Sequence, residues 1–440
     1  MRIHDNIHGY IDLDPIASAI IDTDVFQRLR NIHQTGCLYL VFPTATHTRF
    51  EHSIGTYHLA KQMITMIHNK QPELKITDEI ITLVSLAGLC HDLGHLLFSH
   101  LFDDCFLEKL PNFEEIKVST PNYCHENRSI MLLNYIVEQN NIPLSKDQLK
   151  VIADLINPKE SDYSKWKPKY MIGRWLFQIV SNPLNSIDVD KFDYLTRDTM
   201  AVGLKLGFDY SRIMSDARVI ETNGKSAICY SQQCSEDIYH MFFIRYRLHR
   251  QIYNHKAVKA IEILVIRLLF ELEKELKISE YILDPLKMIQ LVDYFVLSAN
   301  HYTNNTIVKE MINNINKRKL PKLVYQDISL NKIPDTGICD ENKLKQMFGN
   351  NVHITRFKVG YVGGKTNPLN KIYFYNFKDG KILPENKVRN FSLLINQKHQ
   401  EYFIRIYCIE PNMRDTMKEY INQSSSDKKP EDLLPEEFDI

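Results

Sequence analysis

Apolar residues recur every three to four positions from Asp22 to about Phe270, which is the spacing of a helix face turned to a core. The clearest stretch is Asp78–Ser99, where we expect one helix with Asp78 as its N-cap. Asn127–Glu138 and Asp237–Leu276 show the same spacing, and the second is long enough to contain a break. This part of the chain is therefore predicted to be mainly helical.

Short β-type runs predict strands in two other places. A β-hairpin is expected from Ala217–Val219 and Ala227–Tyr230, with Asn223-Gly224 as its turn. After about residue 280, Asn- and Lys-rich segments alternate with further strand-like runs. These runs are Leu323–Tyr325, Val352–Lys358, Ile372–Phe377 and Tyr402–Cys408.

The two textures divide the chain into lobes. We expect a mainly α fold with a helical lobe (1–280), a smaller α+β lobe (281–423) and an acidic, disordered tail (424–440).

Composition excludes several classes of protein. Lys and Arg number 54, as do Asp and Glu, so the formal net charge is 0. A neutral chain is not built to hold nucleic acid over its whole surface, and nucleic acid is not expected as its main ligand. No apolar run suits a membrane helix or a signal peptide. The eight cysteines form no CxxC pair, which favours an intracellular, cytoplasmic or nuclear protein with reduced thiols.

The sharpest chemical feature is the motif His91-Asp92-Leu93-Gly94-His95. If the helix continues through it, His91 and His95 share a face. With His52 upstream and Asp190 downstream, imidazoles and carboxylates suit a divalent ion such as Fe, Mn, Zn or Ni. A buried histidine beside a capping aspartate is the alternative. The preceding run LVSLAGLC favours the metal, because an unpaired carboxylate is costly among apolar residues.

The motif also superficially resembles the HExxH helix of metalloproteases. That helix needs a Glu between its histidines as the general base. Asp92 is one methylene shorter and is better used as a ligand, so a protease is the weaker interpretation.

Several segments, matched in order, make the chain resemble the HD-domain phosphohydrolases. His52, His91-Asp92 and Asp190 follow the H…HD…D pattern of that family. Longer segments resemble the vertebrate SAM-and-HD-domain deoxynucleoside triphosphate triphosphohydrolases. They are DNIHG (5–9), FQRLR (26–30), RFEHSIG (49–55), AGLCHDLGH (87–95), IDVDKFDY (187–194) and LHR (248–250). Because the likeness begins at the N-terminus, no SAM module is expected.

The resemblance implies a helical HD-domain lobe with a C-terminal lobe for regulation and oligomerisation. It implies metal-dependent hydrolysis of deoxynucleoside triphosphates (dNTPs) to deoxynucleoside and inorganic triphosphate, which controls dNTP levels. The transition metal would be held by His52, His91, Asp92 and Asp190, and Mg²⁺ would accompany the substrate phosphates.

A neutral chain must concentrate positive charge locally to hold a triphosphate. Ile244–Lys256 does so, although a solvated basic face explains this segment equally well. Arg245, His249 and Tyr253 are spaced by four, as are Asp190, Tyr194 and Asp198. The resemblance implies that the substrate-binding residues are Arg49, Lys191 and Arg245 on the phosphates, and Gln34, Thr35, Tyr194, Asp198, His249 and Tyr253 around the sugar and base.

The leaving 5′-oxygen needs a proton, and histidine is the natural donor near neutral pH. His95, His100 and His125 are the candidates, and a structural role explains His95 or His125 equally well. The resemblance favours His100, with Asp103, His125 and Glu126 as its neighbours.

The family is activated by nucleotides that join subunits into a tetramer, so we expect GTP as activator and a homo-oligomer that passes from dimer to tetramer. The residues matched to the activator pockets are Asp22, Gln27, Arg30, Arg212, His255, Lys256, Arg318 and Lys322, of which Arg318 and Lys322 would reach a neighbouring subunit. Without the resemblance, Asp22 would be interpreted as a helix N-cap and Arg30 as a surface charge.

Two departures bear on specificity. Ser231, Gln233 and Asp237 replace a basic pair and an Asn of the second activator pocket, and Asp216 replaces an aromatic residue. Losing cations weakens polyphosphate binding, so GTP-only or constitutive activity is expected. Thr35 replaces a Leu that helps exclude a 2′-hydroxyl, which makes discrimination against ribonucleotides less secure.

Two other functions remain open. One is an HD-domain nucleotidase or phosphodiesterase that acts on another nucleotide. The other is a catalytically silent regulator that binds nucleotides or nucleic acid, against which the neutral charge and the full ligand set both count.

Overall fold

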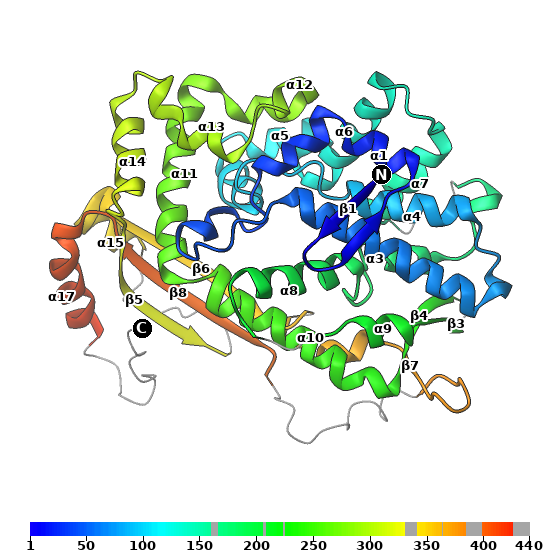
Figure 1. Ribbon diagram of the computed structural model, residues 1–440. Helices are drawn as coiled ribbons and strands as arrows, with labels where there is room; N and C mark the ends of the chain where they lie inside the picture. Colours follow the sequence, from blue (N-terminus) through cyan, green and yellow to red (C-terminus); the bar gives the residue numbers. More distant parts are fainter. Residues whose placement is uncertain are drawn as a thin grey trace.

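The apolar stripes of the sequence form helices around one large core, as the computed structural model shows (Figure 1). The structure describes residues 1–159, 166–205, 208–222, 225–330, 341–362, 364–383 and 398–425. The α-helices are α1 Pro15–Ile21, α2 Asp24–Gln27, α3 Arg49–Lys70, α4 Asp78–Cys90, α5 Phe113–Ser119, α6 His125–Gln139, α7 Lys146–Ile156, α8 Val189–Ala201, α9 Ser211–Ser215, α10 Ser235–Arg247, α11 Lys256–Leu276, α12 Pro285–Met288, α13 Asp293–Leu297, α14 Thr306–Asn316, α15 Glu341–Phe348 and α17 Arg414–Ser425. The mainly α fold class is confirmed.

The strands form three small sheets. They are β1 Arg2–Asp5, β2 Gly9–Asp12, β3 Arg218–Thr222, β4 Lys225–Ser231, β5 Lys322–Ser329, β6 Val352–Gly360, β7 Phe374–Tyr375 and β8 Gln400–Cys408. β1 pairs with β2, and the antiparallel sheet β5–β8–β6 lies at one edge of the helical body (Figure 1). The expected hairpin is confirmed as β3–β4, and its turn residues Asn223 and Gly224 lie outside the described residues.

One expected strand of the C-terminal lobe pairs elsewhere. Of the run Ile372–Phe377, only Phe374–Tyr375 is a strand, and it pairs in parallel with β4. α17 extends to Ser425, and residues 426–440 of the expected tail lie outside the described ranges. The division at residue 280 stays a prediction. Within the described residues, no helix is both long enough and apolar enough to cross a membrane.

The helix expected over Asp78–Ser99 is wrong in its second half. α4 ends at Cys90 with His91 as its C-cap, and its N-cap is Thr77 rather than Asp78. His91 and His95 therefore do not share a helix face. Phe98 and Ser99 adopt left-handed backbone angles, with φ of 55° and 58°.

Buried polar side chains replace the missing helical hydrogen bonds of this segment. Arg128 donates from Nε to the carbonyl of Gly94 at 2.8 Å, and the guanidinium of Arg28 donates to the carbonyl of Leu93. A Cβ on Gly94 would lie 2.1 Å from the carbonyl oxygen of His125, so only glycine fits against α6. The helix ends at Cys90 because side chains of other elements form hydrogen bonds with the backbone of the residues that follow it.

The break expected inside Asp237–Leu276 is confirmed. α10 ends at Arg247, a π-helical turn spans Leu248–Tyr253 (η11), and α11 begins at Lys256. The side chain of His255 accepts a hydrogen bond from the amide of Ala257 and caps α11. The wider turn brings His249 and Tyr253 to the same cavity as Arg245, although the three do not lie on one regular α-helix.

A second, smaller core holds the C-terminal sheet. Its buried members are Leu344, Phe348, Val352, Ile404, Ile406, Cys408, Met417 and Ile421, from α15, β6, β8 and α17. Three of them lie on β8. This strand is the centre of its sheet, because it pairs with β5 on one side and with β6 on the other.

The Ile404→Ala substitution tests this core. Ile404 is fully buried, so we expect its truncation to lower the free energy of unfolding by about 2–5 kcal/mol. Chemical denaturation followed by circular dichroism measures the loss. The matched control is Ile307→Ala on α14, where the side chain is 49% exposed and the cost should stay within about 0.5 kcal/mol. Equal losses for the two variants would contradict the second core.

Candidate active site

Three helices meet where the predicted metal ligands lie. His52 lies on α3, His91 and Asp92 directly follow α4, and Asp190 lies in the first turn of α8. Two glycines allow this approach. A Cβ on Gly88 of α4 would lie 2.9 Å from the carbonyl oxygen of Thr56, and a Cβ on Gly55 of α3 would lie 2.0 Å from the carboxylate of Asp193.

The ligand atoms converge at this junction. The Nε2 atoms of His52 and His91 are 3.3 Å apart, and Oδ1 of Asp190 lies 3.1 Å and 3.6 Å from them. The carboxylate of Asp92 adds Oδ2 at 3.4 Å from His52 Nε2 and Oδ1 at 3.3 Å from His91 Nε2. Two nitrogens and two carboxylates therefore face one point.

The second nitrogen of each imidazole shows that this set fits a metal ion. His91 Nδ1 donates to the carbonyl of Gly88 at 2.8 Å, because a carbonyl can only accept. His52 Nδ1 lies 2.7 Å from Asp193 Oδ2 and donates to that carboxylate. In the neutral rings each Nε2 carries the lone pair, and the two atoms face each other, an arrangement that a divalent cation stabilises.

Asp193 was not among the predicted site residues, although it lies inside the matched segment IDVDKFDY. Its carboxylate also accepts from Arg197 Nη2 at 2.8 Å and lies 2.6 Å from His8 Nε2. Burial alone would raise the pKa of Asp193, but Arg197 and these hydrogen bonds hold it well below the usual range. Asp193 thus stays ionised and fixes the ring of His52.

Neighbouring charged groups shift the pKa values of the metal ligands Asp92 and His52. Arg49 donates to the Asp92 carboxylate and, from Nε, to Ser99 Oγ at 2.8 Å. Burial would raise the pKa of Asp92, but Arg49, His91 and His52 hold it below its usual value. Burial lowers the pKa of His52, yet the carboxylates of Asp190 and Asp193 outweigh it and raise that pKa to about 10.

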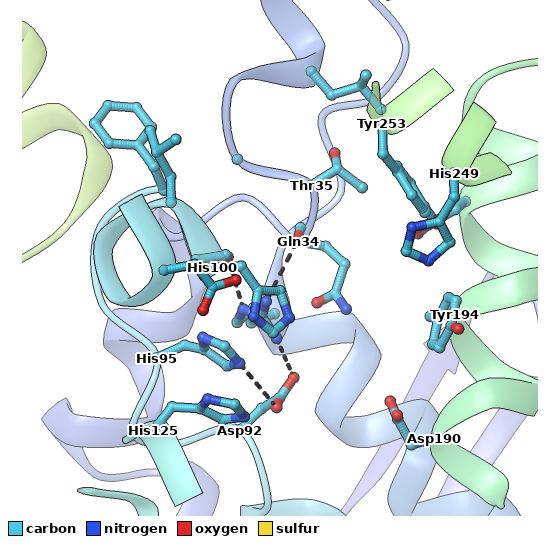
Figure 2. A pocket seen from close by; sticks show the side chains of 18 of the residues that line it. Gln34, Thr35, Asp92, His95, His100, His125, Asp190, Tyr194, His249 and Tyr253 are labelled. Atoms are coloured by element: carbon cyan, nitrogen blue, oxygen red, sulfur yellow. Dashed lines mark hydrogen bonds and ion pairs between the residues drawn. The ribbon is translucent and has the colours of Figure 1, made fainter. Parts of the chain in front are cut away.

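Three further histidines stand beside this junction (Figure 2). The ring of His95 stacks on that of His125 at 3.9 Å and lies edge-on to that of His100 at 4.9 Å. Desolvation by the cavity wall, with Arg49 and His125 nearby, lowers the pKa of His100 to about 4. The structure therefore brings together the three candidate proton donors of the sequence.

The neighbours expected for the proton donors lie there as well. Asp103 Oδ2 is 3.5 Å from His125 Nδ1, and Glu126 Oε1 is 3.6 Å from His125 Nε2. Arg128, which was not predicted, donates to Asp103 Oδ1 at 2.6 Å. His95 Nε2 lies 3.5 Å from Asp92 Oδ1, so the ring of His95 lies between the metal ligands and His125.

One cavity of about 620 Å³ joins these groups to the predicted substrate-binding residues, a size suited to a small ligand. Its lining includes Gln34, Thr35, Arg49, Lys191, Tyr194, Asp198, Arg245, His249 and Tyr253. His95, His100 and His125 lie on one side of the view and Tyr194, His249 and Tyr253 on the other, with Gln34 and Thr35 between them (Figure 2). The side-chain oxygens of Gln34 and Thr35 are buried and have no hydrogen-bond partner among the described residues, which indicates room for a polar ligand.

Supporting contacts hold the cavity residues in place. Tyr253 donates from its hydroxyl to Asp198 Oδ2 at 2.5 Å, and His47 Nε2 lies 2.7 Å from Asp198 Oδ1. Lys191 is 3.2 Å from the buried Asp188 carboxylate. Arg245 donates from Nη1 to the carbonyl of Gly360, at the end of β6. His47 and Asp188 were missed as site residues, because only their contacts reveal them.

The residues matched to the activator pockets lie elsewhere. None of the eight lines the cavity. Arg30 lies over the Phe50 ring at 3.5 Å and donates to Gln27 Oε1 at 2.8 Å. Arg318 donates to the carbonyl of Leu40 at 2.7 Å.

Five of the eight lie at the ends of regular elements, among them Gln27 as the last residue of α2, and a sixth forms an ion pair. Asp22 is the C-cap of α1, so the N-cap interpretation of Asp22 is wrong. His255 caps α11, Lys256 begins it, and Lys322 begins β5. Arg212 Nη1 lies 3.3 Å from Asp237 Oδ2.

Comparison with known proteins places this site in a family. Residues 49–198 match the HD domain model. The chain is 33% identical to the zebrafish (Danio rerio) deoxynucleoside triphosphate triphosphohydrolase SAMHD1, over 98% of this chain and 75% of that one. It is 35% identical to the SAMHD1 homologue of Dictyostelium discoideum (92% and 77%), and 33% identical to the putative HD domain-containing protein L394 of Acanthamoeba polyphaga mimivirus (93% and 92%).

Metal analysis of two variants tests the ligand set. Asp190→Asn should remove nearly all bound transition metal, because it deletes an anionic ligand. Asp193→Asn keeps every ligand but loosens His52, so metal affinity should fall about 10- to 100-fold. Plasma emission spectrometry after dialysis against graded chelator gives both values. Asp415→Asn, exposed on α17, is the control and should match the parent. A full metal complement in Asp190→Asn would refute the assignment.

Proposed function

The chain belongs to the HD-domain family of SAMHD1 deoxynucleoside triphosphate triphosphohydrolases, and we propose that it hydrolyses dNTPs to a deoxynucleoside and inorganic triphosphate. The observation that carries this proposal is one cavity that is lined by three of the four metal ligands (His91, Asp92 and Asp190), by His95, His100 and His125, and by three cations. The fourth ligand, His52, has its Nε2 3.1 Å from Asp190 Oδ1. In the cell such an activity would control dNTP levels.

The three cations would bind the triphosphate. Arg49, Lys191 and Arg245 line the same cavity, and each is held by a carboxylate or a carbonyl of the protein. Charge-assisted hydrogen bonds to phosphate oxygens are strong and directional. These contacts would place the α-phosphorus beside His52, His91, Asp92 and Asp190, and Mg²⁺ would offset the remaining phosphate charge.

The transition metal, for which Fe, Mn, Zn or Ni are candidates, would supply Lewis-acid polarisation and a water of lowered pKa. In the reaction a water oxygen bonds to the α-phosphorus and the bond from phosphorus to the 5′-oxygen breaks. The leaving oxygen takes a proton, and His100 is our candidate donor. With a pKa of about 4, His100 is neutral at pH 7. The negative charge of a bound triphosphate would raise that pKa and so protonate the ring.

The neighbours of His100 would orient it and restore its proton. The ring of His125 lies 5.6 Å from that of His100, and its Nδ1 is 3.5 Å from Asp103 Oδ2, while Arg128 donates to the other carboxylate oxygen of Asp103. His95 would play a supporting part, because its ring stacks on His125. Glu126, at the open side of His125, would exchange protons with solvent.

The deoxyribose would lie between the two walls of the cavity. Gln34 would bind the 3′-hydroxyl, and Tyr253 would pack under the sugar while Asp198 holds its hydroxyl. The Tyr194 and His249 side chains complete that wall. Thr35 offers an unpartnered hydroxyl here, which would make ribonucleotides poorer but tolerated substrates.

A guanine nucleotide is the proposed activator of a dimer-to-tetramer transition. Gln27 accepts a hydrogen bond from Arg30 and donates one to the carbonyl of Ile21, next to Asp22. Arg318, Lys322, His255 and Lys256 would supply further polar groups. In the second pocket Arg212 is paired with Asp237, which competes with a phosphate for the guanidinium. We therefore propose that dNTPs do not activate this enzyme.

Product analysis in ¹⁸O-labelled water tests the reaction. We expect every dNTP turnover to give unlabelled deoxynucleoside and triphosphate with one ¹⁸O, because water attacks the α-phosphorus. Chromatography with mass spectrometry resolves both. His100→Gln should lower kcat about 100-fold or more while the metal content stays constant. His301→Gln, on the exposed surface, is the control. Monophosphate or diphosphate products would instead support another HD nucleotidase, and no turnover would support a silent regulator.

Sedimentation with single nucleotides tests the activation. GTP should convert the protein to tetramers and raise its activity, whereas dATP alone should do neither, because Asp237 already occupies Arg212. Asp237→Asn releases that cation and should make dATP more effective. If dATP assembles the unaltered protein as well as GTP does, the proposal for the second pocket is wrong.

A further inference from the structure

The cavity extends beyond the proposed position of the sugar. None of the predicted site residues lines this far end. Three elements enclose it: η2 (Gly36–Leu40), η4 (Leu101–Phe106) and α11. η2 begins directly after Thr35, η4 begins directly after His100, and α11 follows Tyr253 by three residues. α11 packs against both η2 and η4. If a nucleotide lies as proposed, its base occupies this end.

A charged pair on α11 lines this end of the cavity. Lys259 Nζ donates to Glu262 Oε2 at 2.7 Å, one helical turn apart, and both side chains are mostly buried, with 23% and 15% exposed. Burial would lower the pKa of Lys259, but the Glu262 carboxylate raises it, so Lys259 stays charged. Among the described residues, Glu262 Oε1 has no hydrogen-bond partner, and the ammonium of Lys259 retains two free protons.

The pair therefore presents a donor beside an acceptor, both available to a ligand in the cavity. A carboxylate has about four lone-pair positions, so Oε2 can accept from Lys259 and from a ligand together. Asp104 of η4 lines the same end and adds a second carboxylate. This arrangement suits a ligand edge that carries an acceptor followed by two donors.

We propose that Lys259 and Glu262 recognise guanine, so that dGTP is the preferred substrate of this enzyme. Guanine offers O6 to the ammonium, and its N1–H and N2–H₂ groups to the carboxylate oxygens. The inference rests on the proposed function, because it takes the phosphates to lie at the metal end of the cavity.

The other bases satisfy this pair less completely. Adenine and cytosine each present one amino group and one ring acceptor, which leaves one carboxylate oxygen unpaired. Thymine matches through O4 and N3–H but turns its O2 acceptor towards the carboxylate. A site whose buried polar groups stay unpaired with the wrong ligand discriminates strongly against that ligand.

Competition between the four dNTPs tests the proposal. The full-length, metal-loaded enzyme is given all four at equal concentration with saturating GTP, and kcat/KM ratios are read from their rates of loss. We expect dGTP to be preferred about tenfold or more. Lys259→Met and Glu262→Gln should each bring the four values together by lowering that of dGTP.

A matched ion pair on the same helix supplies the control. Glu271 and Lys274 are also three residues apart on α11 and also 2.7 Å apart, but they lie outside the cavity. Glu271→Gln and Lys274→Met should leave the order of substrates unchanged. Thermal unfolding of all four variants separates a loss of stability from a loss of selectivity, because a purely structural pair would affect all four dNTPs equally.

Two results would overturn the inference. One is equal kcat/KM for the four dNTPs in the unaltered enzyme, and the other is a uniform loss across them in Lys259→Met and Glu262→Gln. Either result leaves the proposed function intact. Failure to release triphosphate from any dNTP would instead refute the proposed function.

Discussion

The structure depends on two imidazole nitrogens, on His52 and His91, that face each other at 3.3 Å. The second nitrogen of each ring is committed to Asp193 or to the carbonyl of Gly88, so Nε2 is the nitrogen that each neutral ring offers to a cation. Lone pairs at this distance repel unless a positive charge lies between them, and the carboxylates of Asp92 and Asp190 favour such a charge. The close approach of α3, α4 and α8, which Gly55 and Gly88 permit, is thus useful chiefly to a protein that binds a metal there.

The rest of the site depends on the position of these two nitrogens at one end of the cavity. A neutral chain must gather its cations where the anion lies, and Lys191 and Arg245 are each held for this purpose by a buried carboxylate or a strand carbonyl. The opposite end of the cavity carries a charged pair of its own on α11. Charge in this protein is therefore local and paired, which explains how a net charge of 0 accommodates a polyanionic substrate.

The fold class could be predicted from the sequence, and so could the candidate ligands that the structure brings together. Apolar spacing gave the helices, and the order of His52, His91-Asp92 and Asp190 suggested the metal. The end of α4 at Cys90 could not be predicted, because long-range partners such as Arg128 satisfy the backbone after it. In the sequence Glu262 is only a polar position on a predicted helix. It lines the cavity because of how α11 packs in the folded protein, which the sequence pattern does not show.

The most direct test of the central claim is to locate the metal in crystals of the unaltered protein by anomalous diffraction above and below its absorption edge. The account predicts one strong peak for a transition metal among His52, His91, Asp92 and Asp190, with Asp193 still hydrogen-bonded to His52. A peak at another group of side chains, or none at these four in protein that releases triphosphate, would contradict it.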